Sequence, residues 1–266
     1  MTLSSENRKQ YHIFISPHFD DVVLSCGGMI ASFAGKESVL VVTIFTGAGE
    51  GKLSRYGKKY IQFCGFKNSR QYFKTRKKEE KKAATILKYE TKWLGFPEAL
   101  FRYKERPVFP RFFYNNKKKL LGKINKDEEI LPALEKKVKN IINSYHQKIK
   151  KVYFPLGVGG HVDHRLLNQI GQGVVRRSQL KKEKVYFYED FPYLLTVNRK
   201  EMIDSFQKKK MKRVKIYLNK KSLKLKQQSI LVYSSQIKPL FKTEKNFEKQ
   251  FIKFYQEPYE NYWHFV

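Results

Sequence analysis

The sequence has little cysteine and no long apolar run. Its two cysteines, Cys26 and Cys64, are too few for a disulfide scaffold and lack the paired spacing of a thiolate metal site. No stretch approaches roughly 18 consecutive apolar residues, the length of a membrane-spanning helix, and the polar N-terminal segment lacks the apolar core of a secretory signal. We therefore expect free thiols, no transmembrane segment and a cytoplasmic protein.

Acidic residues are also scarce. The 24 Asp and Glu stand against 55 Lys and Arg, which gives a formal net charge of +31. A nucleic-acid-binding protein would concentrate such charge on one face, where it displaces counterions from phosphates. Here the lysines are scattered along most of the chain, a distribution typical of a solvated surface. We therefore do not expect nucleic acid as the partner, while the charge leaves an anionic substrate or cell component open.

What the chain does contain is enough apolar side chain for a folded core. Of its 266 residues 41% are hydrophobic, including 21 Phe and 17 Tyr, so intrinsic disorder is not expected despite 30% charged residues. A chain of this length suits one domain with additions. We expect a single domain over residues 1–266, with a core at about 8–195 and an extension at about 196–266.

Short β-branched or aromatic runs alternate with segments of helical periodicity. The runs predict strands at Tyr11–Ser16, Val39–Thr46, Lys92–Phe96, Lys151–Pro155 and Lys184–Glu189. The periodic segments predict helices at Val23–Phe33, Gln71–Leu87, Ile130–Tyr145 and Val162–Arg176. This alternation indicates an α/β fold with a Rossmann-like, mostly parallel sheet flanked by helices.

Two long connections and the C-terminal part depart from this alternation. The connections, Gly47–Ser69 and Arg102–Lys126, have the length of functional lids or mobile insertions. After about Thr196 the chain is Lys-rich, and Lys221–Ser235 and Glu244–Tyr255 have the spacing of amphipathic helices. We predict a mainly helical C-terminal extension packed on the core.

Two clusters of His and Asp follow predicted strands. His18–Asp21 (His-Phe-Asp-Asp) comes directly after the first strand, and His161–His164 (His-Val-Asp-His) follows the fourth across a Gly-rich turn. Either cluster alone could be a helix cap or a buried histidine. Because ligands of an open α/β sheet bind outside the carboxyl ends of its strands, we expect the two clusters to meet in one site.

The residue types in these clusters are those of an open metal centre. Two histidines and one carboxylate can hold zinc while leaving a position for water or substrate, and ferrous iron can use the same donors. The metal lowers the pKa of bound water to about 7 and polarises a carbonyl. A second carboxylate that does not bind the metal can take the proton of that water.

Both clusters also resemble family motifs. Ser16–Asp21 (Ser-Pro-His-Phe-Asp-Asp) is similar to the Pro-His-x-Asp-Asp motif of the PIG-L/LmbE-like family of zinc-dependent N-acetylglucosamine deacetylases, and His161–His164 resembles its His-x-Asp-His motif. Further similar segments extend over nearly the whole chain: Arg76–Glu79 with Ala83, Leu94–Glu98, Phe154–Gly157, Tyr188–Tyr193, Tyr233–Gln236 and Glu260–Trp263.

The resemblance implies roles for the residues of both motifs. It implies that His18, Asp21 and His164 bind the metal. It further implies that Asp20 is the general base, that His161 stabilises the tetrahedral oxyanion or protonates the leaving amine, and that Asp163 orients an imidazole. Zinc and an imidazolium near the oxyanion would both strengthen their interaction as charge develops in the transition state.

Three further residues are candidates for substrate binding. Arg76 matches a family arginine of the substrate site, although a solvated arginine on a basic helix is an equally good interpretation. Glu98 matches a sugar-contacting position at which many members carry Asp. Tyr193 follows the last predicted strand and could reach the pocket or pack in the core. Val22 is a departure, because many members carry Glu there.

The leading hypothesis is therefore a zinc-dependent hydrolase that removes an N-acetyl group from an amino sugar or sugar conjugate. A second hypothesis keeps the metal and water but changes the acyl group or the sugar, as a metal-dependent deacylase or amidase. A third, of a different class, is a basic nucleic-acid-binding protein with a vestigial site. The sequence patterns make no prediction about the oligomeric state, the exact substrate or the physiological metal.

Overall fold

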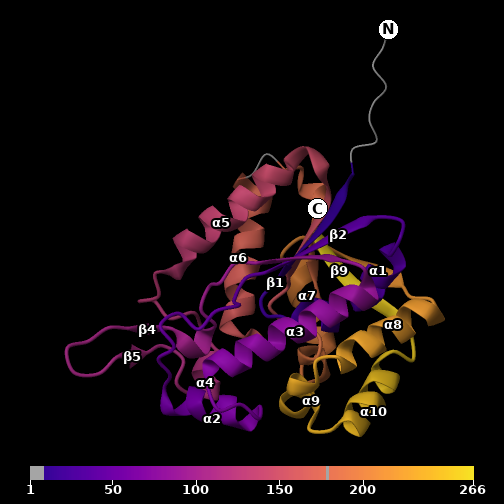
Figure 1. Cartoon of the computed structure of the whole chain (residues 1–266). Helices are drawn as coiled ribbons and strands as arrows, with labels where there is room; N and C mark the ends of the chain where they lie inside the picture. Colours follow the sequence, from indigo (N-terminus) through magenta and orange to yellow (C-terminus); the bar gives the residue numbers. More distant parts are fainter. Residues whose placement is uncertain (1–8, 178–179) are drawn as a thin grey trace.

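The computed structural model describes residues 9–177 and 180–266 (Figure 1). Seven strands form one sheet, in the order β3-β2-β1-β6-β7-β9-β8. Their bounds are Glu90–Trp93 (β3), Ser38–Thr43 (β2), Tyr11–Ser16 (β1), Ile149–Pro155 (β6), Val185–Tyr188 (β7), Tyr259–Phe265 (β9) and Met211–Tyr217 (β8). The first five are parallel, and β9 runs antiparallel to both β7 and β8. The predicted α/β sheet, mostly parallel, is confirmed. The predicted start of the core at about residue 8 lies outside the described residues.

Helices cover both faces of this sheet (Figure 1). On one face lie α1 (Asp21–Phe33), α3 (Ser69–Leu87), α8 (Lys220–Leu231), α9 (Ser234–Phe241) and α10 (Glu244–Phe254). On the other lie α5 (Ile130–Tyr145), α6 (Val162–Arg177) and α7 (Arg199–Lys208). Among residues 9–177 and 180–266, no helix is both long and apolar enough to cross a membrane.

Alternation along β1 explains why both faces are covered. All six residues of β1 are buried; Ile13 and Ile15 belong to one apolar cluster, and Phe14 belongs to the other. Successive side chains of a strand point to opposite faces, so a strand that is buried at every position needs a helical layer on each side. Burial on both faces also fixes the register of β1, whose last residue leads into the His18–Asp21 cluster.

The C-terminal part is less helical than predicted. It contains the four helices α7 to α10, but also β8 and β9, which extend the sheet beyond β7. The strand β8 was missed because its charged side chains alternate with half-buried ones, a pattern that Lys-rich composition hides. The predicted helix Lys221–Ser235 is in fact two helices. They separate near Tyr233, which leaves the helical conformation and donates its hydroxyl to the carbonyl of Phe19 at 2.8 Å.

Several predicted boundaries shift at the same edge of the sheet. The strand predicted at Val39–Thr46 ends at Thr43, and the strand predicted at Lys92–Phe96 is Glu90–Trp93, an edge strand in which polar residues are tolerated. The two long connections contain short elements: α2 (Arg55–Phe63) in the first, and β4 (Tyr103–Lys104), β5 (Arg111–Phe112) and α4 (Lys117–Leu120) in the second.

A buried ion pair attaches the last strand to the first helix. Glu260 of β9 accepts hydrogen bonds from the backbone N–H groups of Gly28 (2.8 Å) and Met29 (3.0 Å) in α1. The ammonium of Lys226, fully buried in α8, lies 2.6 Å from the same carboxylate and donates to the carbonyl of Ser25 at 3.1 Å. Each buried charge thus has a partner, without which its burial would be costly.

A second buried carboxylate makes stability depend on pH. Burial raises the pKa of Glu80 to about 8, against the opposing effect of hydrogen bonds from Thr43 (2.8 Å) and Trp93 (2.6 Å). The folded chain therefore keeps this proton where the unfolded chain has released it. The stability from Glu80 is full below about pH 4.5 and is lost as the pH rises through about 8.

Glu80→Gln has no proton to lose. We therefore expect the stability of this variant, relative to that of the wild type, to increase as the pH is raised from 5 to 9. The gain in free energy of unfolding should be on the order of a few kcal/mol. Denaturant unfolding at both pH values measures it, with the exposed Glu248→Gln as control. An equal difference between variant and wild type at the two pH values would contradict the raised pKa.

Candidate metal centre and active site

The two His and Asp clusters meet at one edge of the sheet. The strand order reverses at β1, which lies between β2 and β6, and this switch point is where an open α/β sheet forms its binding crevice. His18–Asp21 leaves the carboxyl end of β1 and enters α1. His161–His164 follows the carboxyl end of β6 through a short turn and enters α6. The predicted convergence is therefore present in the structure.

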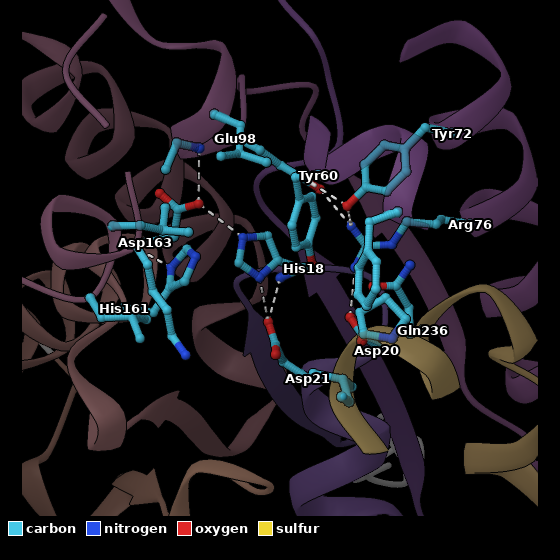
Figure 2. A pocket seen from close by; sticks show the side chains of 18 of the residues that line it. His18, Asp20, Asp21, Tyr60, Tyr72, Arg76, Glu98, His161, Asp163 and Gln236 are labelled. Carbon is cyan, nitrogen blue, oxygen red and sulfur yellow. Dashed lines mark hydrogen bonds and ion pairs between the residues drawn. The ribbon is translucent and has the colours of Figure 1, made fainter. Parts of the chain in front are cut away.

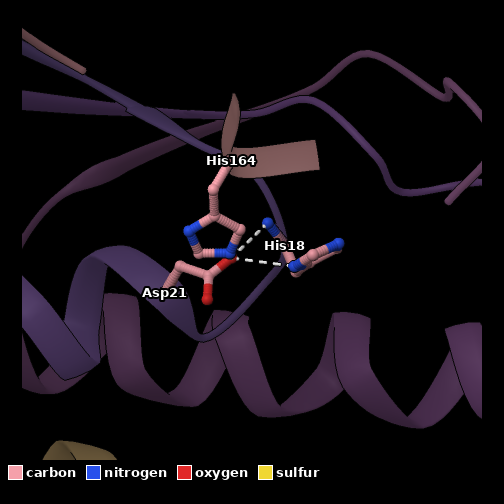
Figure 3. A group of neighbouring side chains, drawn as sticks. All are labelled: His18, Asp21 and His164. Carbon is pink, nitrogen blue, oxygen red and sulfur yellow. Dashed lines mark hydrogen bonds and ion pairs between the residues drawn. The ribbon is translucent and has the colours of Figure 1, made fainter. Parts of the chain in front are cut away.

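Two of the imidazoles converge on one carboxylate oxygen of Asp21 (Figure 3). Oδ2 of Asp21 lies 2.9 Å from Nδ1 of His18 and 3.3 Å from Nε2 of His164. The three residues are buried, and one potential ligand atom from each lies within 4.8 Å of the others. The candidate ligands proposed from the sequence thus come together as one compact donor set.

Two outer carboxylates orient the imidazoles. Asp163 lies 2.9 Å from Nε2 of His18, so Nδ1 of this ring is left facing Asp21. Asp190 lies 2.7 Å from Nδ1 of His164, so Nε2 of that ring is left facing Asp21. A carboxylate behind a histidine fixes its tautomer and raises its basicity, an arrangement typical of metal-binding histidines.

The electrostatics of the donor set favour a cation. Burial alone would lower the pKa of His164, but the charge of Asp21 and the hydrogen bond to Asp190 raise it to about 9. His18 likewise has a raised pKa, because Asp21 and Asp163 outweigh its burial. Burial would raise the pKa of Asp21, yet the two imidazoles hold it well below its usual range. The site therefore stabilises positive charge, carried by protons or by a metal ion.

These residues fit a divalent metal by a further observation. Within the described part of the chain, the buried Nε2 of His164 makes no hydrogen bond, although it lies 3.3 Å from the Asp21 carboxylate. A buried nitrogen without a hydrogen bond is costly, and a metal bound to its lone pair removes that cost. A second group, His18 with His161 and Asp163, is also compact, but its carboxylate already contacts the Arg102 guanidinium and accepts from the backbone N–H of Ala99. The first group is the better ligand set.

His161 lies beside this set without joining it. Its ring centroid is 5.0 Å from that of His18 and 5.4 Å from that of His164. Nδ1 accepts the backbone N–H of Asp163 at 3.2 Å, which leaves the proton of the neutral ring on Nε2. Burial lowers the pKa of His161 well below its usual value. The structure therefore favours a neutral imidazole that donates through Nε2–H.

Asp20 is not part of the donor set and does not cap the helix that follows it. It occupies the N-cap position of α1, but its side chain makes no capping hydrogen bond. Instead, Oδ1 lies 2.7 Å from Nη2 of Arg76, whose Nη1 lies 2.7 Å from Glu98 and 2.6 Å from the hydroxyl of Tyr72 (Figure 2). Burial raises the pKa of Asp20, and Arg76 opposes the rise. Arg76 is thus a buried cation shared by two carboxylates and not a solvated surface arginine.

A cavity of about 310 Å³ opens in front of these groups. It is lined by Asp20, Asp21, His18, His161 and Asp163, by the three candidate substrate residues Arg76, Glu98 and Tyr193, and by side chains of α2, α4 and α9. Figure 2 shows His161 and Asp163 on one side of His18, with Arg76 and Tyr72 on the other. Both long connections therefore contribute a wall, as their length suggested.

Sequence reasoning missed two residues of this site. Asp190 lies in the family-like segment Tyr188–Tyr193 but was not predicted to act in the site, although its place just after β7 is the same signal that marked the two clusters. Arg102 is 5% exposed; its guanidinium lies 2.5 Å from Asp163, contacts Glu128 and faces the ring of Tyr114. No local pattern marks Arg102, because its partners are far away along the chain.

Comparison with known proteins gives a consistent result. The PIG-L family model, described as GlcNAc-PI de-N-acetylase, matches residues 13–175. Two 2'-N-acetylparomamine deacetylases are each 28% identical to the chain. That of Niallia circulans aligns over 199 residues, 70% of this chain and 68% of the relative, and that of Streptomyces fradiae over 197 residues, 72% and 61%. The fold is similar to that of the zinc-inhibited form of teicoplanin deacetylase Orf2, with a TM-score of 0.77, 19% identity, and coverage of 96% of this chain and 97% of that chain.

Proposed function

Because the chain belongs to the PIG-L family of GlcNAc-PI de-N-acetylases, we propose that it is a zinc-dependent hydrolase that removes the N-acetyl group from an amino sugar or sugar conjugate. The observation that carries the proposal is the buried set His18, Asp21 and His164 beside Asp20, a carboxylate in the same cavity that neither joins the set nor caps the helix. Ferrous iron could occupy the same donors. Products are acetate and a free amine.

The residues have separate tasks in this reaction. Zinc, when bound, lowers the pKa of a coordinated water and polarises the amide carbonyl. Asp20 takes the proton of the attacking water and delivers it to the nitrogen as the C–N bond breaks, so that the group leaves as a neutral amine. His161 donates its Nε2–H to the developing oxyanion. Asp163 and Asp190 hold the metal-binding imidazoles in place through hydrogen bonds of 2.9 and 2.7 Å.

The cavity walls support an amino sugar as the substrate. Arg76 and Glu98 offer charged hydrogen-bonding groups, and Tyr60, Tyr72 and Tyr193 offer aromatic faces and hydroxyls in the same cavity. Mixed aromatic and polar walls suit the apolar faces and equatorial hydroxyls of a pyranose. The two deacetylases of an N-acetylated aminoglycoside among the relatives support this substrate class.

The decisive experiment is a screen of the zinc-loaded protein against N-acetylated amino sugars and glycoconjugates, with released acetate as the readout. We expect acetate from at least one of them, and none after chelation. If the zinc-bound protein releases no acetate from any compound of the panel, an N-acetylated sugar is not the substrate, and another acyl substrate is favoured. Tight, steeply salt-dependent binding of DNA or RNA that is unchanged by substitution of Asp20 would instead favour the nucleic-acid hypothesis.

Asp190 offers a test of the outer shell. We expect Asp190→Asn to lower zinc affinity by about 10–100-fold, because the amide keeps a hydrogen bond to His164 but no longer supplies the negative charge behind the ring. Competition with a chromophoric chelator measures the dissociation constant. Asp204→Asn, exposed on α7, is the matched control. Unchanged zinc affinity in Asp190→Asn would show that this contact does not act on the metal.

A further inference from the structure

The most exposed large apolar side chains of the described chain lie next to each other. Val108 and Phe109 are each 78% exposed, in the turn that joins β4 to β5. Figure 1 shows this hairpin projecting away from the sheet, on the side of the molecule that carries α4 and α2. A single exposed apolar residue is ordinary, but an adjacent pair at the end of a projection marks an interaction surface.

The turn is built to hold this pair out in solvent. Pro107 and Pro110 bracket it, and each proline ring fixes its own φ, so the turn loses little conformational freedom when it binds. Tyr103 links the base of the hairpin to the first long connection by donating to Glu50 at 2.7 Å, and its ring, 5.5 Å from that of the paired Phe112, holds the two strands together. The pair is therefore presented on a supported projection.

The segment around the pair is strongly basic. Residues 103–126 contain eight exposed Lys or Arg side chains and a single acidic one, Glu105, which pairs with Lys52 at 2.5 Å. The eight are Lys104, Arg106, Arg111, Lys117, Lys118, Lys119, Lys123 and Lys126, of which Arg111 pairs with Asp127. An apolar tip with basic side chains behind it has the chemistry of a bilayer surface, with acyl chains below and anionic headgroups above.

We propose that the hairpin tip, residues 105–110, docks the chain on an anionic lipid bilayer, with Val108 and Phe109 entering the acyl boundary and the basic side chains at the headgroups. A bilayer fits the tip better than a protein partner, because insertion needs no matching groove. It fits better than nucleic acid, because Val108 is aliphatic and offers nothing for a base or phosphate to bind.

Docking at this place also orients the cavity. Four residues after β5 the chain enters α4, whose Lys117 and Leu120 line the candidate active site. The docked hairpin therefore holds the cavity close to the bilayer surface. The docking itself does not rest on the proposed reaction, and the two are tested by different variants.

The test is co-sedimentation of the full chain with vesicles of phosphatidylcholine alone and of phosphatidylcholine mixed with phosphatidylglycerol. We expect binding to the mixed vesicles, weakened by added salt. The double variant V108S/F109S should bind these vesicles roughly tenfold or more weakly. The matched control is Ile252→Ser, a 66% exposed apolar side chain on α10, which should bind like the wild type.

A second measurement separates insertion from adsorption. In Phe109→Trp, vesicle binding should shift the emission of the new indole to shorter wavelength. Equal binding of V108S/F109S and the wild type, or binding without a shift, would overturn the proposal, since either would reflect adsorption through charge alone. If the wild type does not bind vesicles and forms a dimer in solution, whereas V108S/F109S is a monomer, the tip would instead be a contact with a second copy of the chain. Hydrolysis of a water-soluble N-acetylated sugar by V108S/F109S should equal that of the wild type.

Discussion

Asp20→Asn is expected to hydrolyse the N-acetyl substrate about 10²–10⁴-fold more slowly than the wild type while keeping its zinc. The amide cannot accept the proton of water, and general base catalysis contributes a factor of that size. Zinc should remain, because Asp20 lies outside the compact donor set His18, Asp21 and His164. The measurement is kcat from released acetate, together with the zinc content of the purified variant.

Asp20 also neutralises Arg76, and that second role needs its own control. Glu98→Gln removes the other carboxylate from the same guanidinium but leaves the proposed base in place. We expect Glu98→Gln to change KM more than kcat. A loss of kcat in Glu98→Gln as deep as that in Asp20→Asn would mean that the charge balance of Arg76, rather than proton transfer, explains the effect.

The other large effect should come from the metal ligands. We expect Asp21→Ala to bring activity below detection and to lose far more zinc affinity than the 10–100-fold expected for an outer carboxylate. Its Oδ2 is the atom on which both imidazoles converge, at 2.9 and 3.3 Å. Chelation of the wild type should abolish activity, and zinc should restore it.

Thermal unfolding gives a readout for this prediction that does not depend on substrate. A ligand that binds only the folded state stabilises it, so added zinc should raise the Tm of the wild type and leave that of Asp21→Ala unchanged. The exposed Asp204→Asn should respond to zinc like the wild type. Full activity in wild-type protein from which all metal has been removed would refute metal dependence.

The fold could be predicted where a segment has a clear apolar run or a clear helical periodicity. The bounds of β1 and α5 agree with the prediction at both ends, because β1 is rich in β-branched and aromatic residues and α5 has a strong helical periodicity. The strands β8 and β9 were not predicted because neither has a continuous apolar run; β9 pairs with both β7 and β8, and β8 pairs with β9. Both segments lie within the part of the chain that we predicted to be a mainly helical extension, and no strand was assigned to either.

The site likewise has a part that the sequence could predict and a part that it could not. His18–Asp21 and His161–His164 are local motifs after strands, so their meeting followed from the topology alone. Contacts across the chain are different. That Arg102 reaches Asp163, or that Arg76 lies between Asp20 and Glu98, depends on how α3 and the second long connection pack over the sheet. Short spacing patterns carry no information about such pairs.

The position of β9 has a consequence for the order of assembly. This strand comes from residues 259–265, yet it lies between β7 and β8 rather than at an edge. Its Glu260 carboxylate binds the backbone of α1, the helix that begins at Asp21. During synthesis the N-terminal motif leaves the ribosome long before this partner, so the helix that carries a candidate metal ligand gains this support only after residue 260 has been made. Maturation of the metal centre is thereby coupled to synthesis of the β9 segment.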